Sequence, residues 1–324
     1  MLKKFIKYNL ELFVLFLLIT ISYHDKLPFN KSFSQPVNYP GKDSAEIVFV
    51  SDTQQPRRAE TLYLKENQNE KATGMIFKDI EARKPLALFL LGDLVSLSHK
   101  ESKWSQMDDY LASCKNQNIP CYALLGNHEY MWNAKKGEEN FQKRFPENVS
   151  TGYLKVVDSI AVVLLNSNFK KLTKSQYTIQ QKYYEATLAA LDTNPAIQYI
   201  IVACHHSPYS NSKIVGSSAG ARENFVPLFI KSKKCKLFLS GHSHNFEYFK
   251  HEGKDFLVIG GGGGLNQPLN DQPGKLPDLS PDYKPMFHYL TLKRFPGHLQ
   301  VLSRRLKDDF SEFEDGTAIT ILNP

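Results

Sequence analysis

Short continuous apolar runs recur along this chain, and polar stretches of helical length separate most of them. Apolar runs bounded by turn residues are typical of strands that are covered on both faces of a parallel sheet. The alternation of such runs with helical segments predicts an α/β fold. Strands are predicted at residues 45–50, 86–91, 121–125, 159–165, 198–204, 236–239 and 255–259, and an antiparallel pair at residues 286–306.

The stretches between these runs carry apolar residues at intervals that favour helices. Helices are predicted over residues 57–83 with an interruption near Gly74, and over 101–115, part of 130–144, 175–191 and 221–231. The last residues, 307–324, have no clear pattern and are assigned to a C-terminal tail. The folded domain is therefore predicted to span residues 45–306.

The N-terminus has a pattern of its own. Lys3, Lys4 and Lys7 precede an apolar run at residues 12–21, an order that is typical of an export signal. The run is shorter than the ~20 residues that cross a bilayer, but residues 20–22 form a poor cleavage site. A cleaved signal peptide, a membrane anchor and a buried helix all stay open for residues 1–24. Residues 25–44 form a predicted linker, and the protein is expected to be exported: periplasmic, secreted or anchored facing outside the cytoplasm.

Composition narrows the class of protein. Among the 324 residues, 42% are hydrophobic and 23% charged, which is ordinary for a globular protein and excludes wholesale disorder. The net charge of +7 comes from scattered Lys and Arg residues, which favours a solvated basic surface. No nucleic-acid-binding module is recognisable, and the sequence does not fix the oligomeric state.

The four cysteines match no metal-binding spacing. Cys114 and Cys121 could form a disulfide that closes a short loop. Cys204 ends one predicted strand and Cys235 begins another, so in parallel strands the two thiols would lie at opposite ends of the sheet.

Metal-binding residue types follow several of the predicted strands. In open α/β sheets, ligands bind at the carboxyl ends of the strands, so these side chains are expected to meet at a shared edge. Each one alone could be a helix cap, a turn residue or a core histidine, but together they would leave two buried carboxylates to be neutralised. Oxygen and imidazole ligands suit Mn, Fe, Zn or Mg, and their number suits two ions. The residues are Asp52, Asp93, Asn127, His205, His242 and His244.

Five short blocks in this order resemble those of the calcineurin-like metallophosphoesterase superfamily, which includes the purple acid phosphatases. They are Asp52-Thr53-Gln54, Gly92-Asp93, Gly126-Asn127-His128-Glu129, His205 within residues 202–208, and Gly241-His242-Ser243-His244. The resemblance covers roughly residues 45–305. It implies a four-layer α/β/β/α sandwich and hydrolysis of a phosphate monoester or diester.

The resemblance also implies two divalent metal ions and a role for each ligand. One ion would be held by Asp52, Gln54, Asp93 and His244, and the second by Asp93, Asn127, His205 and His242. A hydroxide bridging the ions would attack the phosphate, and His128 would protonate the leaving oxygen. Asp93 and His128 are therefore the predicted catalytic residues, and Asn127 and His128 are also predicted to contact the substrate.

Further substrate contacts are predicted on loops that would rim the site. His206 could face the substrate, support the metal ligands or simply pack, and Tyr209 and Arg222 could each bind a phosphate or be merely solvated. Residues 260–264 are all glycine but lack the Lys-Ser/Thr ending of a phosphate-binding P-loop, which favours a tight turn beside the metals.

Two positions depart from the family pattern. Gln54 stands where most members have His, so the first metal site would bind its ion loosely or prefer a harder ion. Ser96 stands where purple acid phosphatases have a tyrosinate ligand. Iron(III)-tyrosinate chemistry is therefore not expected. An alternative function follows from Gln54: a membrane-tethered binding protein with the same fold, an impaired metal site and no turnover.

Overall fold

The computed structural model describes residues 46–270 and 276–323. The predicted signal peptide or anchor at residues 1–24 and the linker at 25–44 lie outside these residues. Within the described ranges, no helix combines the length and the apolar character needed to span a membrane.

Two six-stranded sheets form the centre of the fold. The first has the order β12-β11-β10-β1-β2-β3, and the second has the order β4-β5-β6-β7-β9-β8. The strands that carry the site are parallel: β1 with β2 and β3 in the first sheet, and β5 with β6, β7 and β9 in the second. The bounds are β1 Glu46–Val50, β2 Ala87–Leu90, β3 Cys121–Ala123, β4 Tyr153–Val157, β5 Ile160–Leu165, β6 Tyr199–Cys204, β7 Cys235–Ser240, β8 Phe246–His251, β9 Lys254–Ile259, β10 His288–Phe295, β11 His298–Leu306 and β12 Phe313–Leu322.

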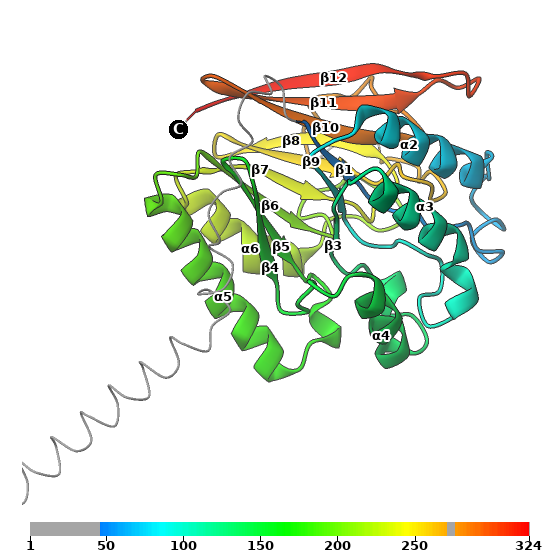
Figure 1. Ribbon diagram of the computed structural model, residues 1–324, viewed down its shortest axis with the longest axis horizontal. Coiled ribbons are helices and arrows are strands. Elements are labelled where there is room, and N and C mark those ends of the chain that lie inside the picture. The colour runs from blue at the N-terminus through cyan, green and yellow to red at the C-terminus, as the bar shows by residue number, and fades with distance from the viewer. Residues whose placement is uncertain (1–45, 271–275, 324) are drawn as a thin grey trace, which may run out of the picture. The chain divides into compact units, whose positions relative to one another are not determined.

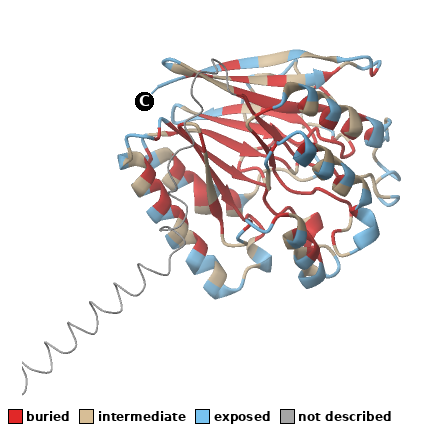
Figure 2. Ribbon diagram, viewed as in Figure 1, coloured by how far each residue is buried: buried red, intermediate tan, exposed pale blue. Residues whose placement is uncertain are grey.

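The two sheets pack face to face, and helices cover their outer faces (Figure 1). One buried cluster joins Phe49 and Phe89 of the first sheet to Ile201 and Leu239 of the second. Separate apolar clusters attach α2, α3 and α4 to the first sheet and α5 and α6 to the second. Figure 2 shows the burial concentrated in the strands. The predicted four-layer α/β/β/α sandwich is confirmed. The helices are α2 Asn69–Arg83, α3 Ser105–Asn116, α4 Ala134–Arg144, α5 Lys174–Thr193 and α6 Ala219–Lys231.

The predicted helix over residues 57–83 is correct only in its second half. Residues 57–64 form turns, and Gln68 has a left-handed backbone (φ 51) immediately before α2. Asn69 then fixes the start of the helix, because its amide donates to the carbonyl of Gly263 at 2.8 Å. The predicted interruption at Gly74 is wrong, since α2 runs through it. A side chain there would crowd the hydroxyl of Tyr110, 3.2 Å from the position of an added Cβ.

The structure contains three strands that the apolar pattern did not reveal. β4 and β8 are antiparallel partners of β5 and β9, and each is joined to its neighbour by a tight turn. β12 lies within residues 307–324, which the sequence pattern assigned to a tail, and pairs antiparallel with β11. The domain therefore extends beyond the predicted boundary at 306. Edge strands such as these have a solvated side, so they lack continuous apolar runs.

All four cysteines are free thiols, so the structure contains no bridge between Cys114 and Cys121. Cys204 ends β6 and Cys235 begins the neighbouring parallel strand β7. The expected separation of these two thiols at opposite ends of the sheet is confirmed.

A buried histidine outside the predicted site makes the stability of the fold sensitive to acid. His288 on β10 is fully buried, with its ring 5.5 Å from that of Phe246, and burial lowers its pKa to about 3. The unfolded chain would bind a proton at this residue below about pH 6.5, whereas the folded protein would not. The stability contribution is therefore present above pH 6.5 and is lost as the pH falls towards 3.

We expect His288→Leu to reduce the loss of unfolding free energy between pH 7 and pH 5 by about 2 kcal/mol. Urea denaturation at the two pH values measures this difference. If the variant lost as much stability between pH 7 and pH 5 as the unchanged protein, the role assigned to His288 would be wrong.

Candidate metal centre

The predicted ligands come from both sheets rather than from the edge of one. Asp52, Asp93 and Asn127 follow β1, β2 and β3 of the first sheet. His205 follows β6 of the second sheet, and His242 follows β7. The facing sheets bring these strand ends together between them, which corrects the expectation of a single shared edge.

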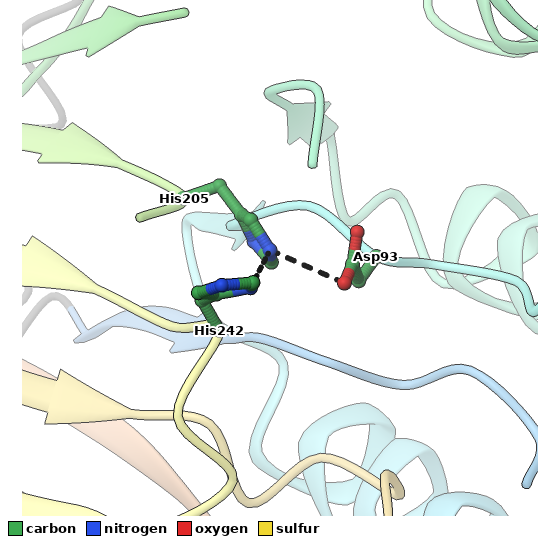
Figure 3. Close-up of side chains that lie close together, drawn as sticks. All are labelled: Asp93, His205 and His242. Carbon is green, nitrogen blue, oxygen red and sulfur yellow. Dashed lines mark hydrogen bonds and ion pairs between the residues drawn. The ribbon is translucent and has the colours of Figure 1, made fainter. Parts of the chain in front are cut away.

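Asp93, His205 and His242 form the tightest group of potential ligands. The Nε2 atom of His205 lies 3.2 Å from Oδ2 of Asp93 and 3.2 Å from Nδ1 of His242. One ligand atom from each of the three residues lies within 4.8 Å of the others. Figure 3 shows the three side chains pointing toward one another. Asn127 joins them, because its Oδ1 is 3.1 Å from Nε2 of His205.

Asp52, Gln54 and His244 form a second group beside the first. The Nε2 atom of His244 lies 3.4 Å from Oδ1 of Asp52 and 3.2 Å from the amide of Gln54. When the Gln54 oxygen faces His244, its NH₂ donates to the carbonyls of Asp52 and Asp93. In this orientation the amide oxygen of Gln54 lies 3.2 Å from Nε2 of His244, so both atoms could bind one ion. Asp52 Oδ1 is buried and has no hydrogen-bond partner among the described residues.

Backbone carbonyls orient two of the histidines for metal binding. Nδ1 of His205 donates to the carbonyl of Leu91 at 3.0 Å, and Nδ1 of His244 donates to the carbonyl of Leu265 at 2.7 Å. A carbonyl accepts but cannot donate, so the proton of each neutral ring is on Nδ1. In the neutral form that binds a metal, each Nε2 therefore presents a lone pair toward the carboxylates.

The ionisable groups of the centre shift one another's pKa values. Burial opposes ionisation of Asp93, but His205 and His128 hold the pKa of its carboxyl well below the usual range. Burial likewise opposes the charge on His205, yet Asp93 and Asp52 raise its pKa. Burial and the neighbouring histidines lower the pKa of His242 well below its usual value. Ionised carboxylates facing a neutral imidazole suit a divalent cation.

Three ligand residues have a left-handed backbone: Asp52 (φ 61), Asp93 (φ 52) and His242 (φ 67). This conformation is uncommon outside glycine, and strained residues concentrate at functional sites. Asp52 and His242 are also tied together, because the backbone N–H of His242 donates to Oδ2 of Asp52 at 2.9 Å. The backbone thus fixes where these side chains point.

Two glycines allow the ligand segments to approach closely. A Cβ added at Gly126 would lie 2.2 Å from Oδ1 of Asp93, and one at Gly241 would lie 2.3 Å from Oδ2 of Asp52. The glycines at 260–264 lie against the first ligand segment, since Gly262 and Gly264 donate to the carbonyls of Ser51 and Asp52. The predicted position of this segment beside the metal ligands is confirmed, and residues 262–264 form bends there.

Glu129 holds two of the ligand segments in register, a role that the sequence motif did not reveal. Its carboxylate accepts hydrogen bonds from the backbone N–H groups of Asp93, Leu94 and Gly126 at 2.7–2.9 Å. Burial and then the charge of Asp93 raise the pKa of Glu129 to about 7, while the three donors oppose this shift. In the sequence, only the position of Glu129 directly after His128 indicated that it belongs to the site.

We expect Glu129→Gln to destabilise the fold by about 2 kcal/mol, because an amide cannot accept all three bonds and its NH₂ would face donors. Thermal unfolding measures the change. Glu139→Gln on the exposed surface of α4 makes the same chemical change and should alter stability by less than about 0.5 kcal/mol. Equal effects of the two substitutions would contradict the role of Glu129.

His128 lies beside Asp93 with one ring nitrogen directed away from the backbone. Its Nδ1 donates to the carbonyl of Ser96 at 2.9 Å, and its backbone N–H donates to Oδ1 of Asp93 at 2.7 Å. Nε2 lies 3.8 Å from Oδ2 of Asp93. The ring is therefore held with Nε2 facing the cluster, where it could exchange a proton with a bound molecule.

The three predicted rim residues have different surroundings. His206 packs against the ring of His242 at 4.4 Å and shares a 2.8 Å hydrogen bond with Ser167, which sequence reasoning had left without a role. Tyr209 packs against Phe256 at 5.0 Å, in the apolar cluster on the outer face of the second sheet. Arg222 is exposed on α6. The structure brings His206 to the centre, whereas no described contact links Tyr209 or Arg222 to the ligands.

Comparison with known proteins agrees with this geometry. Residues 45–246 match the family described as calcineurin-like phosphoesterase. Over 234 residues, the chain is 24% identical to tartrate-resistant acid phosphatase type 5 of Oryctolagus cuniculus, covering 66% of this chain and 71% of that protein.

Solved structures share the fold. A purple acid phosphatase from yellow lupin (Lupinus luteus) matches 88% of this chain and 55% of its own, with a TM-score of 0.64 and 19% identity. GAP50, described as the anchor in the inner membrane complex of Plasmodium, matches 87% of this chain and 90% of its own, with a TM-score of 0.63 and 13% identity. The chain thus spans just over half the length of the lupin protein.

The family match covers all five ligand segments, and in the structure these segments converge as the motif predicts. The chain belongs to the calcineurin-like phosphoesterase family.

Proposed function

We propose that this protein is an exported phosphoesterase that uses two divalent metal ions to hydrolyse a phosphate monoester or diester. The observation that carries the proposal is the convergence of two carboxylates with His205, His242 and His244 from separate strand ends. Similarity to acid phosphatases supports the reaction class. When bound, the ions would activate water and polarise the phosphoryl oxygens.

The residues present fit such ions. Asp52, whose Oδ1 accepts no hydrogen bond among the described residues, would hold one ion together with Gln54, Asp93 and His244. Asp93, Asn127, His205 and His242 would hold the second. Asn127 and His128 would also orient the substrate phosphate. His128 would hold the proton for the leaving oxygen on Nε2, while its bond to the carbonyl of Ser96 keeps the ring in place.

Metal reconstitution tests the function. Metal-free protein would be loaded separately with Mn, Fe(II), Zn or Mg and supplied with nucleotides, phosphodiesters, sugar phosphates and phospholipid head groups. We expect two bound ions per chain and hydrolysis of at least one class. Two bound ions without any hydrolysis would refute the enzymatic function.

The N-terminal sequence supports export. Lys3, Lys4 and Lys7 followed by the apolar run at 12–21 would direct a reporter enzyme out of the cytoplasm when residues 1–44 are fused to it. The size of the exported product distinguishes a cleaved signal from an anchor. A reporter that stays in the cytoplasm would contradict this part of the proposal.

A membrane-tethered binding protein is the second candidate. Two observations favour it: the neutral ligand Gln54, and the fold shared with a Plasmodium protein described as an anchor. This function predicts one bound ion and no turnover across the same substrates, so the reconstitution experiment distinguishes the two.

A further inference from the structure

Glu60 lies beside the proposed proton donor, on the turn that follows the first ligand segment. Its Oε1 is 4.0 Å from Nε2 of His128, and its side chain is 22% exposed. Its Oε2 accepts a 2.9 Å hydrogen bond from the backbone N–H of Arg57, which holds the carboxylate in this orientation. A fixed negative charge therefore stands next to the atom from which a leaving group would receive its proton.

Glu60 also forms an ion pair with Arg57, and the guanidinium of Arg57 is shared with a second partner. Its Nε lies 3.6 Å from Oε1 of Glu60, beyond hydrogen-bonding distance, and its Nη1 donates to Sδ of Met131. Of this pair, the carboxylate of Glu60 is the group with an atom 4.0 Å from Nε2 of His128, on the more exposed side of the ring than the buried Asp93.

We propose that Glu60 determines substrate specificity by disfavouring esters with an anionic leaving group and favouring those with a cationic one. The inference rests on the proposed phosphoesterase function. Every substrate carries the same phosphate, so the field of Glu60 discriminates only through the charge of the departing alcohol. Near a protein surface, the interaction of Glu60 with a charge a few ångströms away on the departing alcohol should change the hydrolysis rate by roughly tenfold.

Exposed aromatic residues on the same two loops support a cationic leaving group. Tyr63 is 68% exposed, and its backbone N–H donates to the carbonyl of Glu60. Trp132 directly follows Met131, is 84% exposed and has a left-handed backbone (φ 64), which is rare for so large a residue. Aromatic faces attract organic cations, including quaternary ammonium groups.

Three substrates of similar size test the proposal: phosphocholine, glycerol 3-phosphate and 3-phosphoglycerate, whose leaving groups are cationic, neutral and anionic. We expect kcat/KM of the metal-loaded full chain to fall in that order. Glu60→Gln should reduce the ratio of phosphocholine to 3-phosphoglycerate by about tenfold, and Glu60→Lys should reverse the order. Glu66→Gln removes the same charge from an exposed position on the following stretch and should change the ratio less than about twofold.

Two outcomes would overturn the specificity proposal alone. The first is an unchanged ratio in Glu60→Gln while all three esters are hydrolysed. The second is a preference of the unchanged protein for 3-phosphoglycerate, which would mean that the positive charge of Arg57, and not the negative charge of Glu60, acts on the leaving group. Absence of turnover on these esters and on a chromogenic phosphate ester, with every metal, would instead refute the phosphoesterase function and the specificity with it.

Discussion

Replacing Asp93 by Asn is expected to lower kcat/KM for a chromogenic phosphate ester by at least about 10³-fold. Asp93 is the only carboxylate in the group that it forms with His205 and His242. Its Oδ2 faces His205, and its Oδ1 accepts the backbone N–H of His128. An amide would remove the negative charge that both predicted ions share.

Asp109→Asn is the matched control, because Asp109 is exposed on α3 and undergoes the same chemical change. It should leave kcat/KM within about twofold. Turnover that survives in Asp93→Asn would show that the bridging role is wrong. Metal analysis of the same variant should reveal fewer than two bound ions.

Replacing His128 by Asn is expected to lower kcat by roughly 10²–10⁴-fold for alkyl phosphates, the range typical of a lost general acid. The loss should be much smaller for p-nitrophenyl phosphate, whose leaving group departs without a proton. An alkoxide needs this proton in order to leave. Nε2 of His128 is the nitrogen that can supply it, because Nδ1 is engaged by the carbonyl of Ser96.

His251→Asn, on the exposed end of β8, provides the control and should change neither rate. The dependence on leaving group is the decisive measurement. Equal losses for alkyl and p-nitrophenyl esters would assign His128 to binding the phosphate charge and would exclude its role as proton donor.

The order of Asp, Asn and His residues along the chain was the sequence feature that best predicted the site. Asp52, Asp93, Asn127 and His205 each follow an apolar run that proved to be a strand with a parallel neighbour in one of two mixed sheets. Continuous apolar runs predict such strands well because both faces of the strand are buried. The same reasoning missed β4, β8 and β12, whose burial is partial, and placed helix where residues 57–64 form turns.

Contacts between distant segments could not be predicted in this way. Glu129 accepts hydrogen bonds from backbone N–H groups, which every residue except proline has, so no sequence pattern marks its partners. Glu60 lies in a turn without periodicity, and only the fold brings it to His128, 68 positions later in the numbering of the chain. Tyr209 shows the opposite error: the sequence predicted that it lies on the rim of the site, but in the structure it packs against an apolar cluster.

The sequence by itself determined the residue types of the centre and the strands that carry them, because buried strands and metal ligands each impose a local chemical pattern. Only the tertiary structure decided that two facing sheets supply the ligands, that Nδ1 of His205 and of His244 is engaged by a backbone carbonyl, and that Glu60 stands at His128. These features depend on distances between segments far apart in the chain. Such distances are set by the packing of the whole core and leave no trace in any one segment.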